Sequence, residues 1–166
     1  MHLEAYEGFG WMLHASGLTT LDHRTVLDVG GQHINGTVHD LMPGAEITTL
    51  DLENADIIAD ARLWVPDRLF DVVIATEVFE HVAEWRDVLA TMKRALDPQG
   101  PGILLATCAS TDRPVHGATG APLPAENEWY ANVNPSDLTM ALDALFSESQ
   151  VHYRYPPGDA YMWAQL

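Results

Sequence analysis

Thr25-Val-Leu-Asp-Val-Gly-Gly-Gln-His-Ile-Asn-Gly36 is the stretch of sequence that decides the fold. A continuous apolar run ends in an acid and paired glycines, and the chain then turns toward a helix. This pattern is typical of a buried parallel strand that leads into a nucleotide-binding loop. The next predicted strand, Glu46–Leu50, is followed by Asp51, roughly twenty residues past the glycines, where an acid can accept hydrogen bonds from two ribose hydroxyls. Together these signals predict a bound adenosine compound.

The composition is that of an ordinary globular protein. The chain has 166 residues, of which 47% are hydrophobic and 19% charged, and we expect one domain spanning residues 1–166. One cysteine excludes an internal disulfide, and the N-terminus lacks the features of a signal peptide, so we expect a cytoplasmic protein. A net charge of −16 counts against nucleic acid as a partner, and no apolar run reaches the length of a membrane helix. A homo-oligomer stays open.

Short apolar runs alternate with amphipathic segments along the chain. Helices are predicted at roughly residues 3–17, along an apolar face from Trp85 to Leu96, and after Asn134, which caps a helix with Pro135 at its first position. The predicted strands are Thr25–Val29, Glu46–Leu50, Asp56–Ala59, Phe70–Ala75, Gly102–Cys108, Gln150–Tyr155 and Ala160–Leu166. A turn-rich joint separates the last two strands. We therefore expect an α/β fold with a doubly wound, mostly parallel, seven-stranded sheet and an antiparallel C-terminal hairpin.

Six short motifs follow one another along this framework. They are Val26-Leu-Asp-Val-Gly30, Leu50-Asp51, Ala59-Asp60, Phe70-Asp-Val-Val-Ile-Ala-Thr-Glu77, Glu80-His-Val82 and Leu96-Asp-Pro-Gln-Gly100. In this order they resemble the class I S-adenosylmethionine-dependent methyltransferases over nearly the whole chain. The resemblance implies a Rossmann-like methyltransferase fold and S-adenosyl-L-methionine as the cofactor.

The first loop departs from the common form of this family, which has three alternating glycines after the acid. Gln32 and Ile34 stand where the second and third glycines are usual. The loop is instead similar to a subgroup with Gly-Ser-x-x-Val-Asn-Gly, which also carries Arg-Pro-x-His-Gly and Tyr-x-Asn after the fifth strand. Here these segments read Arg113-Pro-Val-His-Gly117 and Tyr130-Ala-Asn132. Gln32 and Asn35 could supply polar contacts to the cofactor or serve only in the local turn.

The resemblance places the cofactor around the strand ends. Gly30 would allow close backbone approach, because any side chain there would occupy the ligand's space. Asp28 would order the loop or reach the cofactor's ammonium through water, unless it only caps the following turn. Asp60 matches the acceptor for the adenine amino group, with a helix N-cap as the equal alternative. The expected cofactor-binding residues are Asp28, Gly30, Gly31, Gln32, Asn35, Asp51, Leu52, Asp60, Ala61, Thr76 and Glu77.

Candidate catalytic residues follow the fourth and fifth strands. Thr76–Val82 should line the pocket near the reactive methyl group, where Glu80 and His81 could accept a proton or anchor the substrate. Glu-His-Val occurs across this family whatever the substrate. This favours a structural role, or a role in lining the cofactor cleft, over catalysis for Glu80 and His81. His116 is the best candidate for a general base, because an imidazole changes protonation near neutral pH. A surface histidine is the alternative.

The segment Thr111–Val133 is rich in Pro and Gly and long for a domain of this size. Such loops are usually functional lids or disordered, and adjacent aromatic residues favour a lid or substrate wall. The expected substrate contacts are Asp112, Arg113, Trp129, Tyr130 and Asn132. Among the eight histidines no pair has the tight helical spacing of a zinc site, and Cys108 stands alone on a core strand, so no metal ligand is predicted.

Methyl transfer to an oxygen, nitrogen or carbon nucleophile of a small-molecule acceptor is the function that these features favour. One alternative is a non-catalytic S-adenosylmethionine-binding partner subunit, which the altered glycine pattern motivates. A second is an NAD-linked oxidoreductase, because such enzymes also place an acid after the second strand. The chain lacks their usual Gly-x-Gly-x-x-Gly spacing.

Overall fold

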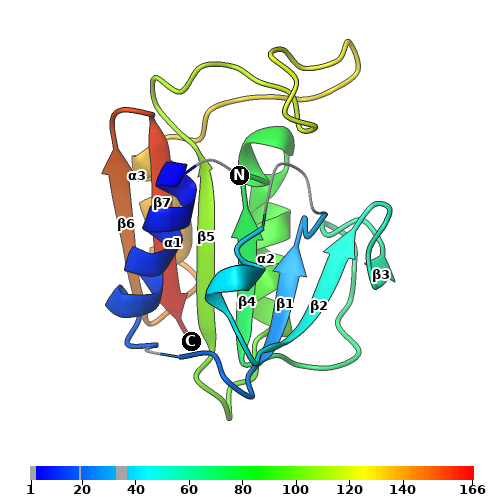
Figure 1. Cartoon of the computed structure of the whole chain (residues 1–166), viewed down its shortest axis with the longest axis vertical. Coiled ribbons are helices and arrows are strands. Elements are labelled where there is room, and N and C mark those ends of the chain that lie inside the picture. The colour runs from blue at the N-terminus through cyan, green and yellow to red at the C-terminus, as the bar shows by residue number, and fades with distance from the viewer. Residues whose placement is uncertain (1–2, 19, 33–36) are drawn as a thin grey trace.

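The computed structural model describes residues 3–18, 20–32 and 37–166. Over these residues one sheet forms, with the strand order β3-β2-β1-β4-β5-β7-β6 (Figure 1). Its strands are β1 (Thr25–Val29), β2 (Glu46–Asp51), β3 (Ile57–Ile58), β4 (Val72–Thr76), β5 (Ile103–Ala109), β6 (Glu148–Arg154) and β7 (Asp159–Gln165). The first five strands pair in parallel, whereas β7 runs antiparallel to both β5 and β6. The predicted fold class is confirmed.

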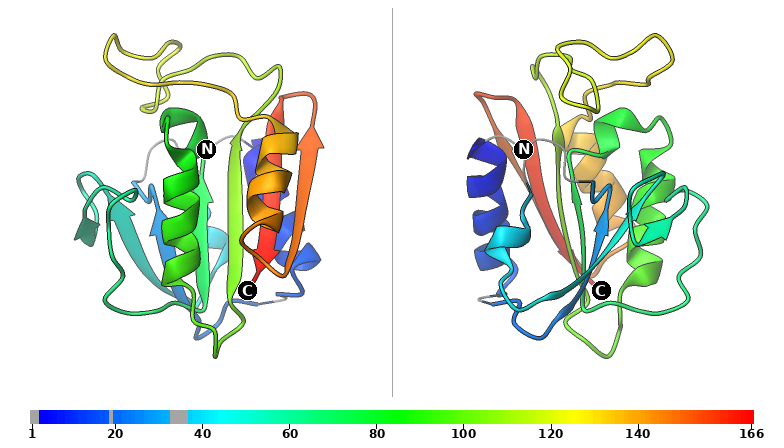
Figure 2. Two further views of the ribbon diagram at one scale, coloured as in Figure 1. Left: turned by 180° about the vertical axis from the view of Figure 1, so that it is seen from behind. Right: turned by 45° about the vertical axis from the view of Figure 1, so that its right-hand side comes forward.

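Helices cover both faces of the sheet (Figure 2). The helix α1 (Leu3–Ala15) and the short 3-10 helix η1 (His39–Leu41) pack on one face. The helices α2 (Trp85–Ala95) and α3 (Pro135–Asp143) pack on the other. Within the described part of the chain, no helix is long and apolar enough to cross a membrane.

Strand β4 shows why the central strands are continuously apolar. Val72 and Ile74 belong to the core under α1, whereas Val73 and Ala75 belong to the core under α2, and all four are fully buried. A strand that is covered on both faces cannot alternate apolar and polar residues. The edge strand β6, in contrast, alternates partly buried and exposed residues along its length.

Local sequence signals set the start of α3. Asn134 precedes the helix in an extended conformation, and its side chain accepts a hydrogen bond from the Ser136 N–H at 2.8 Å. Pro135 occupies the first helical position, where its missing N–H costs nothing. The predicted cap is confirmed, and α3 then packs Leu138 and Leu142 against the sheet.

Several predicted elements are shorter in the structure. The helix expected after the first loop is represented, among the described residues, by the single turn of η1. Strand β3 contains two residues instead of the four predicted, and the residues 61–63 that follow form a turn and no helix. Helix α1 ends at Ala15 and not at residue 17, where Gly17 takes a φ of +75° that favours glycine.

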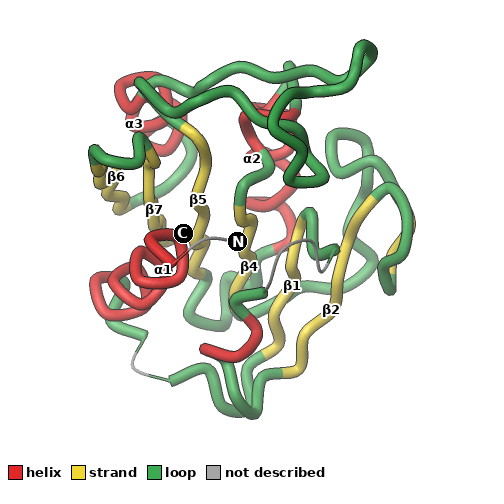
Figure 3. The backbone as a smooth tube through the Cα atoms, turned by 45° about the horizontal axis from the view of Figure 1, so that its top comes forward, coloured by secondary structure: helices red, strands yellow, loops and turns green. Residues whose placement is uncertain are grey.

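The parallel strands point their carboxyl ends toward one edge of the sheet, and the long segment between β5 and α3 crosses above that edge (Figure 3). We call residues 111–133 the strand-end loop. In an open parallel sheet this edge is where ligands bind, because loops from neighbouring strands meet there. The fold thus brings the first loop, Asp51, η2 (Phe79–His81) and the strand-end loop to one side of the molecule.

Candidate functional site

The first loop leaves β1 through two glycines that the packing requires. Gly30 has a φ of +77°, and a Cβ on it would lie 2.4 Å from Cγ2 of Val78. A Cβ on Gly31 would lie 2.8 Å from Cγ2 of Thr49. The backbone N–H of Gly30 donates to the carbonyl of Leu50 at 2.8 Å. The backbone of Gly30 and Gly31 therefore packs closely between the end of β2 and the segment after β4.

A contact between a buried carboxylate and an imidazole ring connects the two sides of this loop. Oδ2 of Asp28, which is only 4% exposed, lies 2.7 Å from Nε2 of His39 in η1. The contact ties the end of β1 to the element on the far side of the loop, in keeping with the loop-ordering role expected for Asp28. Gln32 Nε2 donates to the Glu53 carbonyl at 3.0 Å, a contact with the segment after β2 and not with its own turn. Asn35 lies outside the described residues.

Asp51 stands directly beside the first loop. It ends β2, one residue past the Val29–Leu50 pair of the ladder, and its side chain is partly exposed. Its Oδ1 accepts a hydrogen bond from the Leu52 N–H at 2.6 Å, and no described residue donates a hydrogen bond to its Oδ2. One oxygen thus fixes the carboxylate while the other stays accessible to a donor. The side chain of Leu52 is 69% exposed at the same edge.

A cavity of about 450 Å³ opens next to the first loop. This volume lies in the range of sites that hold small ligands. Thr49 and Asp56 shape one wall, because the Thr49 N–H donates to Oδ2 of Asp56 and the Asp56 N–H donates to Oγ1 of Thr49, both at 2.9 Å. The cavity is lined by Gly31, His39, Ile47, Thr49, Asn54, Ala55 and Asp56.

Asp60 is engaged by Arg62. Its Oδ1 accepts a hydrogen bond from the Arg62 N–H at 2.9 Å, and its Oδ2 pairs with Nη2 at 2.6 Å. Arg62 also pairs with Glu84 at 2.7 Å. These contacts, chiefly the Arg62 side chain, lower the pKa of the Asp60 carboxyl. No helix follows Asp60, so the N-cap role considered for it does not apply, and the side chain caps a turn instead. Ala61 packs partly buried against the core beside it.

The end of β4 turns sharply toward η2. Thr76 pairs with Thr107 in the ladder, and Glu77 takes a φ of +59°, which is unusual for a residue with a side chain. Oγ1 of Thr107 donates to Oε1 of Glu77 at 2.8 Å. Such strained residues persist where the surroundings hold them, and they often occur at functional sites.

Glu80 lies beneath this turn and is fully buried. Its Oε1 accepts a hydrogen bond from the Ala109 N–H at 2.9 Å, and its carbonyl accepts from the Ala131 N–H at 2.8 Å. Burial, and next the charge of Glu77, raise the pKa of Glu80 well above its usual value. Glu80 therefore joins η2 to β5 and to the end of the strand-end loop.

His81, His116 and Tyr130 form what we call the ring cluster. Their ring centroids lie 5.0 to 5.4 Å apart, and every pair meets edge-on. Burial and the neighbouring His116 lower the pKa of His81, and burial raises the pKa of Tyr130. One ligand atom each from Glu80, His81 and His116 lies within 4.8 Å of the others. The structure thus brings together the three residues expected to act in catalysis.

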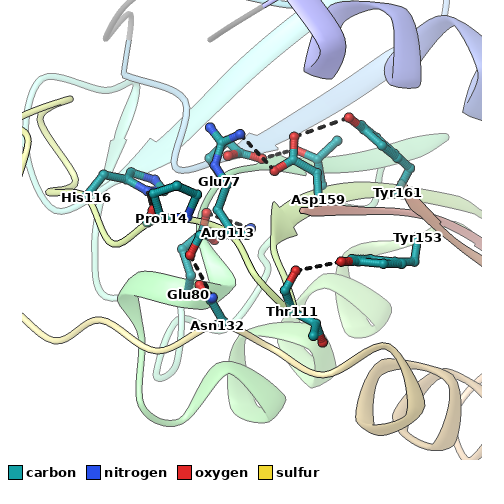
Figure 4. A network of polar contacts seen from close by, with 12 residues as sticks. Glu77, Glu80, Thr111, Arg113, Pro114, His116, Asn132, Tyr153, Asp159 and Tyr161 are labelled. Carbon is teal, nitrogen blue, oxygen red and sulfur yellow. Dashed lines mark hydrogen bonds and ion pairs between the residues drawn. The ribbon is translucent and has the colours of Figure 1, made fainter. Parts of the chain in front are cut away.

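Arg113 holds the beginning of the strand-end loop on the C-terminal hairpin (Figure 4). Its Nη1 lies 3.3 Å from Oδ1 of Asp159, a fully buried side chain at the start of β7. The hydroxyl of Tyr161 donates to Oδ2 of the same carboxylate at 3.2 Å. Nδ2 of Asn132 donates to the Arg113 carbonyl at 2.9 Å, which closes the base of the loop. Arg113 and Asn132, expected as substrate contacts, both hold the loop in place.

Two other expected substrate contacts lie on the surface. Asp112 is exposed and takes a φ of +65°, and the Trp129 side chain is 52% exposed. Tyr130 is the one of the adjacent aromatic pair that turns inward, where its hydroxyl donates to Oδ1 of Asn132 at 2.8 Å. The Tyr130 ring thus meets His81 of η2 edge-on.

Comparison with known proteins decides the family. Residues 12–145, most of the chain, match the methyltransferase domain family. This chain belongs to that family. The resemblance to class I S-adenosylmethionine-dependent methyltransferases is thereby confirmed. No curated protein matches the chain in sequence.

Solved methyltransferases share the fold of this methyltransferase. The complex of DhpI with SAH has a TM-score of 0.69 at 19% identity, covering 98% of this chain and 84% of that one. The 1,6-didemethyltoxoflavin-N1-methyltransferase of Burkholderia thailandensis has a TM-score of 0.66 at 18% identity, covering 96% and 77%. The glycopeptide N-methyltransferase MtfA has a TM-score of 0.62 at 17% identity, covering 96% and 90%. At such identities the likeness shows the fold alone.

Several polar residues of this methyltransferase's site carry no signal in the sequence. The sequence pattern indicates only that Asp159 belongs to the turn before the last strand. In the structure Asp159 is the buried partner of Arg113. His39 belongs to no motif, although it braces the first loop. Glu128 accepts hydrogen bonds from the N–H groups of Ala118 and Ala125 and lies 3.5 Å from Nδ1 of His81. Local patterns miss these residues, because most of their partners are distant in the sequence.

Proposed function

We propose that this methyltransferase transfers a methyl group from S-adenosylmethionine to a small-molecule acceptor that binds between η2 and the strand-end loop. The observation that carries the proposal is the position of Asp51 beside Gly30. The Gly30 N–H donates to the Leu50 carbonyl, so that the glycine loop and the acid occupy one edge of the sheet. An acid there is suited to the ribose hydroxyls of an adenosine cofactor.

The residues present fit this cofactor. Oδ2 of Asp51 accepts no hydrogen bond from the described residues and can accept one from a ribose hydroxyl. The backbone of Gly30 and Gly31 would face the methionine part, and Thr76 and Glu77 would lie toward the reactive centre. Leu52, Ala61 and Asp60 would border the adenine, with Asp60 shared between its turn and the base. When bound, S-adenosylmethionine supplies an electrophilic methyl group and leaves as S-adenosylhomocysteine.

The chain's own contribution is to position the acceptor. The ring cluster and Glu80 lie where the strand-end loop meets η2, and the loop is fixed at its base by Arg113 and Asn132. Holding an acceptor atom in line with the methyl group can account for much of the rate of such a reaction. His116 and His81 are the groups suited to anchor the acceptor or to take its proton.

Structural neighbours support the acceptor class. Two of those described above are named as N-methyltransferases, one for 1,6-didemethyltoxoflavin and one for a glycopeptide. Nearly all of this chain aligns with each of them, so the described residues carry no large insertion that would serve to dock a large substrate. We therefore favour a small molecule or a short peptide-like compound as the acceptor, bearing an oxygen, nitrogen or carbon nucleophile.

A binding module without methyl transfer is the second candidate. The observation that favours it is Gln32, which occupies a usual glycine position and whose side chain is bonded to Glu53. Such a module would bind the cofactor and fail to convert any acceptor. The family match favours methyl transfer over the NAD-linked alternative.

Calorimetric titration with S-adenosylmethionine and S-adenosylhomocysteine tests the cofactor. A hydrogen bond from a ribose hydroxyl to a charged acceptor is lost in Asp51→Ala, so we expect affinity to fall about 10- to 100-fold. Glu53→Ala is the matched control, because it removes an exposed acid two residues away from Asp51. Absence of binding to either compound by the folded wild-type chain would refute the proposal.

A further inference from the structure

Three side chains able to ligate a metal ion meet where the strand-end loop crosses η2. Glu80 and His81 come from η2, and His116 comes from the loop. The fold brings them together from distant parts of the sequence, which is why their spacing along the chain carries no metal signature. Each offers one ligand atom, and the three atoms lie within 4.8 Å of one another.

The surroundings of His116 leave it ready to act as a ligand. Its Nδ1 lies 3.1 Å from the carbonyl oxygen of Pro114. A carbonyl can only accept a hydrogen bond, so Nδ1 carries the proton and Nε2 keeps its lone pair. Histidine ligands of metal ions almost always donate their other ring N–H to a carbonyl or carboxylate in this way. The Tyr130 hydroxyl, 3.3 Å from the same nitrogen, further fixes the ring.

Glu80 and His81 each carry a buried polar atom that has no hydrogen-bond partner among the described residues. Oε1 of Glu80 is fixed by the Ala109 N–H, whereas Oε2 is buried and has no hydrogen-bond partner among the described residues. Nδ1 of His81 is likewise buried without a hydrogen bond from those residues, and Oε1 of Glu128 faces it at 3.5 Å. Buried polar atoms without partners are uncommon in folded proteins, and a bound ion would satisfy both of these atoms.

We propose that Glu80, His81 and His116 bind one divalent transition-metal ion. Two imidazoles and a carboxylate suit zinc and its first-row neighbours, whereas magnesium and calcium prefer oxygen ligands. Ligand atoms around a tetrahedral zinc ion lie about 3.4 Å apart, so a small inward movement of the loop would bring the three onto one ion. Three protein ligands leave a coordination position open, as in catalytic metal sites.

The ion would join the strand-end loop to the sheet at a point away from the loop's base. Arg113 and Asn132 hold the base, and His116 would add a contact near Tyr130. The open position would orient an oxygen or nitrogen atom of the acceptor, a role that rests on the proposed function. His116 would then be a ligand and not a free base.

Titration of the chelator-treated full chain with Co²⁺ and Zn²⁺, without any cofactor, tests the site. We expect one ion per chain, with the visible absorption of Co²⁺ bound to nitrogen ligands. His116→Ala and Glu80→Gln should each weaken metal binding at least about 10- to 100-fold. Removing a residue that only orients a metal ligand already costs this much affinity, and these variants remove a ligand itself. His14→Ala, which removes an exposed histidine of α1, is the control and should bind normally.

Two further readouts separate the explanations. Zn²⁺ should slow proteolysis of the strand-end loop in the wild type and in His14→Ala, but not in His116→Ala. Equal metal binding by His116→Ala, Glu80→Gln and the wild type, or no binding by the wild type, would overturn the site. Calorimetry with S-adenosylmethionine is run separately on the same proteins. A chain that binds the cofactor but no ion overturns only the metal site, and one that binds the ion alone overturns only the proposed cofactor.

Discussion

At Gly30 the fold itself requires glycine. Its φ of +77° disfavours any side chain, and the nearest neighbour of an added Cβ is the Val78 side chain rather than open space. The sequence pattern explains this glycine only by the approach of a ligand. The structure adds a second reason, because the loop must pass close to the segment after β4 before any ligand binds.

Replacing Gly30 tests this requirement. Gly30→Ala should lower the free energy of unfolding by about 2 kcal/mol or more, since backbone strain and overpacking both contribute. Gly10→Ala is the contrast: an added Cβ in α1 meets nothing within 4 Å, so stability should rise by about 0.5–1 kcal/mol. Urea denaturation of both variants measures the difference. If Gly30→Ala were as stable as the wild type, close packing would not explain this glycine.

The two roles of Asp60 can also be separated. Its pKa is lowered in the folded state through Arg62, so the carboxylate stabilises the fold above its ordinary pKa of 3.8, and that contribution is lost as pH falls through the folded value. The pair is partly exposed, so Asp60→Asn should cost less than about 1 kcal/mol at pH 7, and the cost should shrink as pH falls through the folded pKa. A stability cost independent of pH would contradict this account. A simultaneous fall in S-adenosylmethionine affinity would show that Asp60 also contacts the adenine.

At the scale of elements, the strand-end loop depends on the C-terminal hairpin. Arg113 reaches the fully buried Asp159 at the start of β7. Gly158 precedes Asp159 and has a φ of +102°. A Cβ on Gly158 would lie 2.6 Å from the backbone nitrogen of Arg113. The hydroxyl of Tyr153 on β6 donates to the carbonyl of Thr111 at 2.7 Å. The hairpin thus completes the sheet and also supports the loop.

Removing the guanidinium tests this support. Arg113→Met should destabilise the protein by about 2 kcal/mol or more, because it leaves the Asp159 carboxylate buried without this cation. Arg154→Met, which breaks the exposed pair with Glu7, should change the stability far less, because water and salt screen that pair. Thermal and urea unfolding compare the two variants. Similar small costs for both would mean that the buried pair does not hold the loop.

Sequence patterns located elements well where burial was complete. The strand Thr25–Val29 has the predicted bounds, because its buried apolar residues run up to the glycine at which the strand ends. β3 is shorter than predicted because it is an edge strand that pairs with β2 at two positions only. The helix expected after the first loop was an extrapolation from nucleotide-binding loops, and its place is taken in the described chain by η1.

At the scale of the whole molecule, the site divides into a predictable half and an unpredictable half. Gly30 and Asp51 follow consecutive strands, so parallel pairing alone brings them to one edge. The encounter of His116 with His81 depends on the path of a long loop that no periodicity describes. The partnership of Arg113 with Asp159 depends in addition on where the hairpin turns. Motifs therefore point to candidate residues but do not predict which distant residues surround them.

The closed base of the strand-end loop has a consequence for how this protein can change. Oγ of Ser110 donates to the Val133 carbonyl at 2.7 Å, and Asn132 donates to the Arg113 carbonyl at 2.9 Å, so the loop begins and ends at one place. Residues between these points can be exchanged or lengthened at little entropic cost, since loop-closure entropy grows only slowly with length. Under the proposed function this loop borders the acceptor, so the acceptor side would be a part of the enzyme that can be exchanged independently. New acceptor preferences could be selected by varying residues 114–131 alone while the cofactor side stays unchanged.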